Sequence, residues 1–235
     1  MTMKSPFGRI EDLFNTLNDA GIKYLVLRNY ENLLEPELYV DGHGDIDMLC
    51  IDSQEIVDLI NAQVLTHDKP GMRGDGVHYA IEVDGKPVKL DLRHLGDGYY
   101  CTKWEKEMLE RRVGHDCFYV MNETDYFYSL IYHAVLQKRS LSQEYSSRLF
   151  QMSKGLGLVM TSANEHEYLL LLQEYMREHG YRFTYSKDHL VPNRFHLVDQ
   201  GLIDKDRGLK WKHSLYNMKI GMIEWLVKVK HALLH

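Results

Sequence analysis

Two aspartates separated by one residue, Asp45 and Asp47, are the best candidates in this chain for chemistry. In a β-strand, residues i and i+2 share a face, so both carboxylates would leave the same side of the strand. Carboxylates this close repel one another unless a cation lies between them, and Mg²⁺ prefers carboxylate oxygen, water and substrate phosphate as ligands. The pair therefore predicts a metal site. The alternative is a strand end where both acids meet solvent or cap the next helix.

A third acid extends this predicted metal site. Asp91 lies in the alternating segment 88–93, between Lys89 and Arg93, and a sheet could bring it beside the first pair. Three acids on adjacent strands can hold two ions about 4 Å apart, which bind a triphosphate and activate a hydroxyl for in-line displacement. Asp91 would complete the shell of the catalytic ion and is the candidate to take the proton. We expect two Mg²⁺ ions, with Mn²⁺ as the alternative metal.

The elements that must position these acids follow from the hydrophobic pattern. Its period changes near residue 121 from a mixed helix–strand pattern to a helical one, which predicts a catalytic domain over 1–120 and a helical domain over 121–235. In the first part we expect a helix over 8–20 and strands over 24–28 and 45–51. Ser53 is placed to cap a helix over 54–62. The two strands are interpreted as neighbours connected by crossover helices.

A hairpin is predicted to carry the third acid. Residues 77–83 and 88–92 alternate in polarity and flank Asp84-Gly85. This dipeptide favours a type I′ turn, because both central positions need a positive φ.

The second part is predicted to be helical. Asn122 precedes one helix, and Ser162 begins a capping box with Glu165 that opens another, which ends at Gly180. The stretch 181–208 has mixed signals and is predicted to be irregular. A last amphipathic helix is expected from apolar residues at helical spacing: Leu215, Met218, Met222, Trp225, Val229 and Leu233.

Three segments together resemble a known family. They are Tyr24-Leu-Val-Leu-Arg-Asn-Tyr-Glu31, Gly44-Asp-Ile-Asp-Met-Leu49 and Val88-Lys-Leu-Asp-Leu-Arg93. Together they resemble the DNA polymerase β-type nucleotidyltransferase superfamily, as a divergent bacterial member, over residues 8–120. The resemblance implies a mixed sheet with flanking helices (α/β, α+β), two Mg²⁺ ions, and transfer of a nucleoside monophosphate from a nucleoside triphosphate such as ATP. It assigns the metal-binding pair to Asp45 and Asp47 and the third acid to Asp91.

The chain departs from this family at the turn that binds the triphosphate. Where the family has Gly-Ser after its first strand, this sequence has Arg28-Asn29. A guanidinium binds phosphate through a bidentate fork, so Arg28 could replace the turn; the alternative is a structural ion pair with Glu31 or an aspartate. Gly44 permits close approach of backbone to phosphate, and Lys138 could offset triphosphate charge.

Composition limits the possible partners and compartments. The net charge of −6 divides into +5 over residues 205–235 and −11 over the rest, and an acidic body argues against binding of duplex nucleic acid. The basic terminal helix could contact a membrane surface peripherally, or pack on its own domain. The sequence lacks a signal-peptide or membrane-spanning pattern, so we expect a cytoplasmic protein. Its three cysteines favour neither disulfides nor a thiolate zinc site.

Other residues were weighed as site candidates. His133 could face the cleft from a helix or could be structural. Residues 96–100 could offer tyrosine faces at the cleft mouth, although a plain turn is the simpler interpretation. Trp104 and the charged residues 105–112 are interpreted as a surface helix. The zinc-protease, P-loop, dinucleotide-binding and nucleophile-elbow motifs are absent from the sequence.

We therefore expect a nucleotidyltransferase with a small-molecule or sugar acceptor, in surface-polysaccharide biosynthesis. Two alternatives remain open at this point. One is a phosphotransferase that uses a CDP-linked donor, and the other is a non-catalytic, nucleotide-binding or antitoxin-like module. The sequence does not indicate the base, the acceptor or the oligomeric state.

Overall fold

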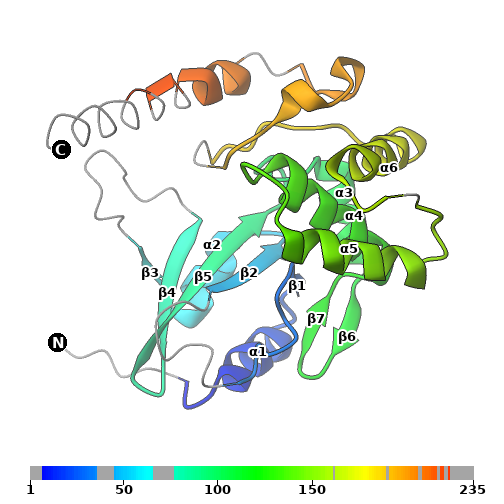
Figure 1. Ribbon diagram of the computed structural model, residues 1–235. Coiled ribbons are helices and arrows are strands. Elements are labelled where there is room, and N and C mark those ends of the chain that lie inside the picture. Colours follow the sequence, from blue (N-terminus) through cyan, green and yellow to red (C-terminus); the bar gives the residue numbers. More distant parts are fainter. Residues whose placement is uncertain are drawn as a thin grey trace, which may run out of the picture.

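A mixed β-sheet flanked by helices forms the centre of the molecule (Figure 1). The structure is a computed structural model that describes residues 7–35, 45–65, 77–160, 162–188, 191–205, 208–215, 218–219 and 222. Within these residues the sheet has seven strands in the order β3-β4-β5-β2-β1-β7-β6. The strands are β1 (Tyr24–Val26), β2 (Asp45–Cys50), β3 (Gln63–Val64), β4 (His78–Val83), β5 (Lys86–His94), β6 (Val113–His115) and β7 (Phe118–Val120). The predicted α/β fold is confirmed.

The helices divide between the two faces of the sheet (Figure 1). They are α1 (Ile10–Asp19), α2 (Ser53–Ile60), α3 (Thr102–Glu110), α4 (Glu123–Ile131), the π-helix η2 (Tyr132–Leu136), α5 (Gln143–Gly155), α6 (Glu165–Glu178) and the 3₁₀ turns η3 (Phe195–Leu197) and η4 (Gln200–Leu202). Apolar residues of α1 and α2 share one core with the sheet, and those of α3 to α6 share another. The chain passes from β7 directly into α4, and a domain division between 1–120 and 121–235 stays a proposal.

Strand β2 shows why the acids face the second core. Ile46 and Met48 belong to the core under α1 and α2, whereas Leu49 belongs to the core under α3 to α6. Alternation then places Asp45 and Asp47 on the face of Leu49. β2 pairs antiparallel with β1 and parallel with β5. The prediction that β1 and β2 are neighbours is confirmed. The prediction of a crossover connection between them is wrong, because antiparallel neighbours need no crossover.

The predicted hairpin forms as β4 and β5. Asp84 and Gly85 have φ values of 49° and 74°, as a type I′ turn requires. Its two-residue loop pairs Val83 with Lys86, and from there the register places His78 opposite Asp91. The turn thus determines which side chain accompanies the third acid.

Two predicted helix starts are shifted by one or two residues. Asp52, not Ser53, caps α2 and accepts a hydrogen bond from Gln54 N at 2.9 Å. Asn164, not Ser162, caps α6. In both places two polar residues lie within two positions of each other, and the one whose backbone is extended just before the helix becomes the cap.

Helix α3 is exposed along one face, where Lys106, Glu110 and Arg111 meet solvent as predicted, but its other face is buried. Trp104 and Glu105 are both fully buried, and the Glu105 carboxylate accepts hydrogen bonds from Gly96 N and Tyr100 N at 2.8 and 3.1 Å. Burial, and next the charge of Asp97, raises the pKa of Glu105 to about 8. The prediction is wrong for Trp104 and Glu105. The helix buries this acid because its carboxylate binds the loop that follows β5, a contact that the local charge pattern does not indicate.

The remaining predictions on the second half are tested in part. α4 begins after its Asn122 cap, α6 ends before Gly180, and the described part of 181–208 is largely irregular. Residues 208–215 are helical, but Trp225 and the other residues beyond 222 lie outside the described part of the chain. Four apolar residues of this segment are exposed: Trp211, Leu215, Met218 and Met222.

Two further expectations concern membrane segments and cysteines. Among the described residues, no helix has the length and apolar character needed to cross a bilayer. All three cysteines are free thiols, of which Cys50 and Cys101 are buried and Cys117 is half-buried.

Candidate active site

Three carboxylates converge on one face of the neighbouring strands β2 and β5. Each of Asp45, Asp47 and Asp91 offers one oxygen, and these oxygens all lie within 4.8 Å of one another. The parallel register sets Asp47 directly opposite Asp91, while Asp45 lies two residues earlier on the same face of β2. The structure therefore brings together the three acids that the sequence predicted. We call them the acidic trio.

The acidic trio is partly removed from water. Asp47 is buried, Asp91 is half-buried and Asp45 is exposed at the start of β2. Burial, followed by the charge of Asp47, raises the pKa of Asp91 to about 6, and the same two causes raise the pKa of Asp45. The shifts have the sign expected of carboxylates that repel one another, and a cation between them would relieve that repulsion.

Arg28 supplies a positive charge on the β1 side of the acidic trio. Its Nη2 lies 2.7 Å from Asp47 Oδ1, and both side chains are largely buried. Burial works against the charged guanidinium, but the Asp47 carboxylate outweighs it, so the pKa of Arg28 is raised. Of the partners considered from the sequence, an aspartate is the one found, because Glu31 pairs with Arg148 instead.

Asn29 gives the chain a turn directly after β1. Its φ of 55° lies in the left-handed region, which asparagine adopts more readily than most residues. A turn therefore exists where the resembled family has Gly-Ser. Gly44, the other predicted phosphate-binding residue, lies outside the described residues.

His78 is a site residue that the sequence analysis missed. Its Nε2 lies 3.5 Å from Asp91 Oδ2, across the β4–β5 pair. The sequence could have predicted this contact, because a two-residue turn at Asp84-Gly85 fixes a hairpin register in which His78 pairs with Asp91. A histidine there can offset the Asp91 charge when protonated.

A cavity of about 300 Å³ opens beside Asp91. Eight of its ten lining residues have polar side chains. The lining comes from β4, β5, the loop after β5, η2 with the residues just after it, and the chain on either side of 190: His78, Asp91, Arg93, Tyr99, His133, Gln137, Lys138, Asp188, Val191 and Pro192. His133 and Lys138 therefore lie in the same cavity as the third acid. We call it the Asp91 cavity.

Arg93 and Tyr99 line the Asp91 cavity, and Arg93 connects strand β5 to the second half of the chain through an ion pair. Arg93 Nη1 lies 3.0 Å from Asp188 Oδ2, and the Arg93 guanidinium stands 4.4 Å from the centre of the Tyr99 ring. Tyr99 and Tyr100 are both buried. The loop over 96–100 is therefore packed inside the protein, with the Tyr99 ring against Arg93 and, at 5.8 Å, against Arg28.

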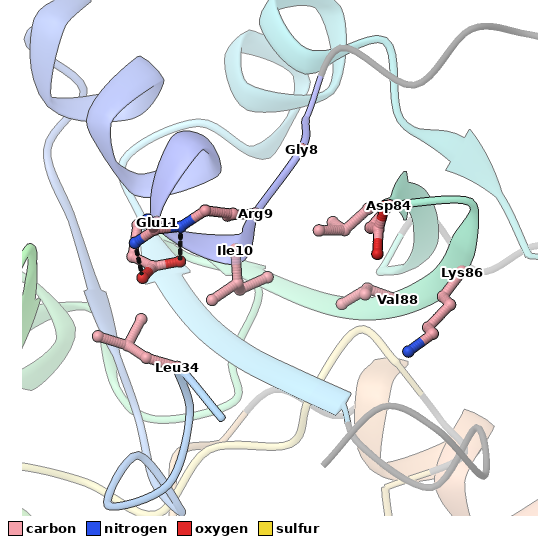
Figure 2. Close-up of a pocket in the computed structure, with 9 residues that line it drawn as sticks. Gly8, Arg9, Ile10, Glu11, Leu34, Asp84, Lys86 and Val88 are labelled. Carbon is pink, nitrogen blue, oxygen red and sulfur yellow. Dashed lines mark hydrogen bonds and ion pairs between the residues drawn. The ribbon is translucent and has the colours of Figure 1, made fainter. Parts of the chain in front are cut away.

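A second cavity, of about 350 Å³, lies by the β4–β5 turn and the start of α1 (Figure 2). Its charged residues include Arg9 and Glu11, which form an ion pair with each other. Val88 lines it from the face of β5 opposite to Asp91. This cavity is separate from the acidic trio and its lining lacks a comparable group of acids.

Comparisons with known proteins give limited information. No protein-family model matches the sequence, and no curated protein matches it. One solved structure that aligns is an antigenic nucleotidyltransferase-like protein from Paracoccidioides brasiliensis, with a TM-score of 0.39, 12% identity, and coverage of 72% of this chain and 86% of that one. The antibiotic-resistance factor ANT(2'')-Ia aligns with a TM-score of 0.38, 9% identity, and coverage of 72% and 89%.

JHP933 from Helicobacter pylori aligns with a TM-score of 0.37 and 11% identity over 96% of both chains. At such scores the comparisons describe a distant similarity, so the function must be argued from the acidic trio and its surroundings.

Proposed function

We propose that this protein is a metal-dependent nucleotidyltransferase. It would transfer a nucleoside monophosphate from a nucleoside triphosphate to a hydroxyl of a small molecule or sugar, in surface-polysaccharide biosynthesis. The observation that carries the proposal is the convergence of three carboxylate oxygens, all within 4.8 Å of one another, on two paired parallel strands.

The residues of the acidic trio fit divalent ions. Three hard oxygen donors converge, and in the described part of the chain the ionic partners are Arg28 at Asp47 and, when protonated, His78 at Asp91. Asp45 and Asp47 would hold both of two Mg²⁺ or Mn²⁺ ions, and Asp91 would hold one. When bound, such ions neutralise triphosphate charge and lower the pKa of an attacking hydroxyl.

The protein's own residues divide the work of positioning between the two sides of the acidic trio. Arg28, with the turn at Asn29, lies on the β1 side and would bind the triphosphate. The Asp91 cavity is lined by residues of β4 and β5 and would hold the acceptor. This arrangement suits in-line displacement, in which the entering and leaving groups occupy opposite sides of the α-phosphorus.

The reaction is balanced by one bond formed and one broken. The acceptor oxygen bonds to the α-phosphorus, the bond from that phosphorus to the bridging oxygen breaks, and pyrophosphate leaves with the electron pair. Asp91 faces the acceptor side and would receive the hydroxyl proton.

The proposal is tested by thermal unfolding with the four nucleoside triphosphates, with and without Mg²⁺ or Mn²⁺, together with an assay of pyrophosphate release. We expect at least one triphosphate to stabilise the protein only when metal is present, by about 2.7 kcal/mol at a hundred times its dissociation constant. In Asp45→Asn this shift should disappear, and pyrophosphate release should fall about a hundredfold or more.

Asp84→Asn is the matched control, because it removes an exposed acid at a turn position where asparagine is also favoured. It should leave both measurements unchanged. Absence of pyrophosphate with every triphosphate and both metals would refute the proposal. Release of CMP from a CDP-linked donor would instead support the phosphotransferase alternative, and full biological function in Asp45→Asn would support the non-catalytic one.

A further inference from the structure

The Asp91 cavity has a chemical character that bears on the acceptor, and this inference rests on the proposed function. Its volume of about 300 Å³ is at the lower end for small-molecule sites, and eight of its ten lining residues are polar. The polar groups of these residues can form hydrogen bonds with a small hydroxylated molecule.

A π-helix shapes one wall of the Asp91 cavity. His133 lies within η2 and Lys138 lies two residues beyond its last residue, and both line the cavity. A π-helical turn leaves backbone carbonyls without their usual helical donors. Arg194 occupies two of them, with its backbone N 3.0 Å from Leu136 O and its Nη1 3.1 Å from Val135 O.

A bidentate ion pair fixes Arg194 in that position. Its Nη1 and Nη2 donate to the two carboxylate oxygens of Glu165 at 2.8 and 2.9 Å. This charged clamp therefore holds the carbonyls of Val135 and Leu136, which lie in the chain between His133 and Lys138. π-Helical turns are uncommon in helices and occur often at functional sites.

The charges in the Asp91 cavity leave one cation for a ligand. Arg93 is neutralised by Asp188, and Asp91 belongs to the acidic trio. Lys138 is exposed, and in the described part of the chain no carboxylate lies at ion-pair distance from its ammonium group. It is therefore the positive charge available to a bound molecule.

His133 contributes hydrogen bonding, not charge. Its ring is buried, and its Nδ1 lies 3.1 Å from Gln137 Oε1. Burial, and then the positive charges of Arg28 and Lys138, lowers the pKa of His133, so the ring is neutral. A neutral ring that donates through Nδ1 to Gln137 has Nε2 left as an acceptor for a hydroxyl.

We propose that the Asp91 cavity binds the acceptor, and that the acceptor is a small polyhydroxylated molecule carrying an oxyanion, a phosphate or a carboxylate. Lys138 binds the oxyanion, His133 and Gln137 contact hydroxyls, and a further hydroxyl faces Asp91. Lys138 then serves the second substrate, because it lines the Asp91 cavity, while Arg28, which pairs with Asp47, serves the triphosphate.

The test measures binding of three probes by isothermal titration in the absence of nucleotide: glucose, glucose 6-phosphate and glucuronate. At least one of the two anionic probes should bind more tightly than glucose, and their comparison distinguishes phosphate from carboxylate. Lys138→Met should weaken binding of the anionic probe about tenfold, the effect of losing one charge-assisted hydrogen bond. It should leave glucose binding and the triphosphate-induced thermal shift unchanged.

Lys154→Met is the matched control, since Lys154 is also an exposed lysine and does not line the Asp91 cavity. It should bind all probes like the native protein. Equal binding of all three probes, or anion binding that survives Lys138→Met, would overturn the proposal. A loss of triphosphate affinity in Lys138→Met would overturn it too, by assigning this lysine to the donor. Anion binding through Lys138 in a protein that releases no pyrophosphate would refute the proposed function and leave the anion site standing.

Discussion

Replacing Asp91 by asparagine removes one of three mutually repelling charges while keeping the shape of the side chain. In the metal-free protein, burial and the charge of Asp47 raise the pKa of Asp91 from 3.8 to about 6. This difference corresponds to about 3 kcal/mol of unfavourable free energy for keeping the carboxylate ionised in the folded state. Asp91→Asn avoids that cost, so the variant should be more stable than the native protein when Asp91 is ionised.

The stability gain in Asp91→Asn must depend on pH, and the direction of that dependence follows from proton binding by Asp91. Between pH 3.8 and about 6 the folded protein holds a proton on Asp91 that the unfolded chain has lost, so the stability of the native protein falls as the pH rises. The gain in Asp91→Asn is therefore largest at pH 8, about 3 kcal/mol, and about half of that at pH 5. For a chain of this size the gain at pH 8 corresponds to a rise of roughly 6 to 12 °C in Tm.

The assay is thermal unfolding of both proteins in EDTA at pH 5 and pH 8, with Asp84→Asn as the control that should not change. Titration with Mg²⁺ or Mn²⁺ at pH 8 gives a second readout. Metal should stabilise the native protein and have little effect on Asp91→Asn, because one ligand and the repulsion that metal relieves are both lost. If Asp91→Asn were destabilising at pH 8, or equally stabilising at both pH values, the argument from repulsion within the acidic trio would be refuted.

Two further predictions concern the elements that support the Asp91 cavity. Gly98 has a φ of +77°, and a Cβ there would lie 2.5 Å from Tyr185 O, so Gly98→Ala should cost about 3 kcal/mol or more in urea unfolding. Gly157→Ala, at φ +69° with open space around it, should cost only about 1 kcal/mol, and equal losses would contradict the close approach. Arg194→Met should cost about 2 kcal/mol by breaking the pair with Glu165 and should weaken binding of the anionic probe, while Arg194→Lys recovers only part of both losses. Unchanged probe binding in Arg194→Met would show that the π-helical turn does not depend on this clamp.

Much of the fold could be predicted because its signals are local. The Asp84-Gly85 turn set the hairpin register, and alternation along β2 placed Asp45 and Asp47 on one face. The cap of α4 at Asn122 was also predicted. Where two polar candidates stood close together, as Asp52 and Ser53 do, the sequence could not decide which backbone would be extended.

The errors at α3 and at His78 have a different origin. Helix α3 carries alternating charges that are typical of a solvated surface, yet Glu105 is buried because it binds the backbone of the loop before it. His78 was overlooked although its pairing with Asp91 follows from the hairpin turn. The role of Glu105 depends on a loop that its own helical pattern does not contain, whereas the hairpin pattern did contain the signal for His78.

The sequence by itself determined which acids are candidates and on which face of its strand each side chain lies. Strand alternation and a two-residue turn decide this, and both depend only on residues close together in the chain. Only the tertiary structure decided that β5 lies beside β2 in parallel, with Asp47 opposite Asp91. It also decided that Arg28 pairs with Asp47, and that Lys138, just after η2, lines the cavity beside Asp91. These contacts join residues that are far apart in the chain, and packing free energy summed over the whole sheet and both cores selects them, which no local preference can do.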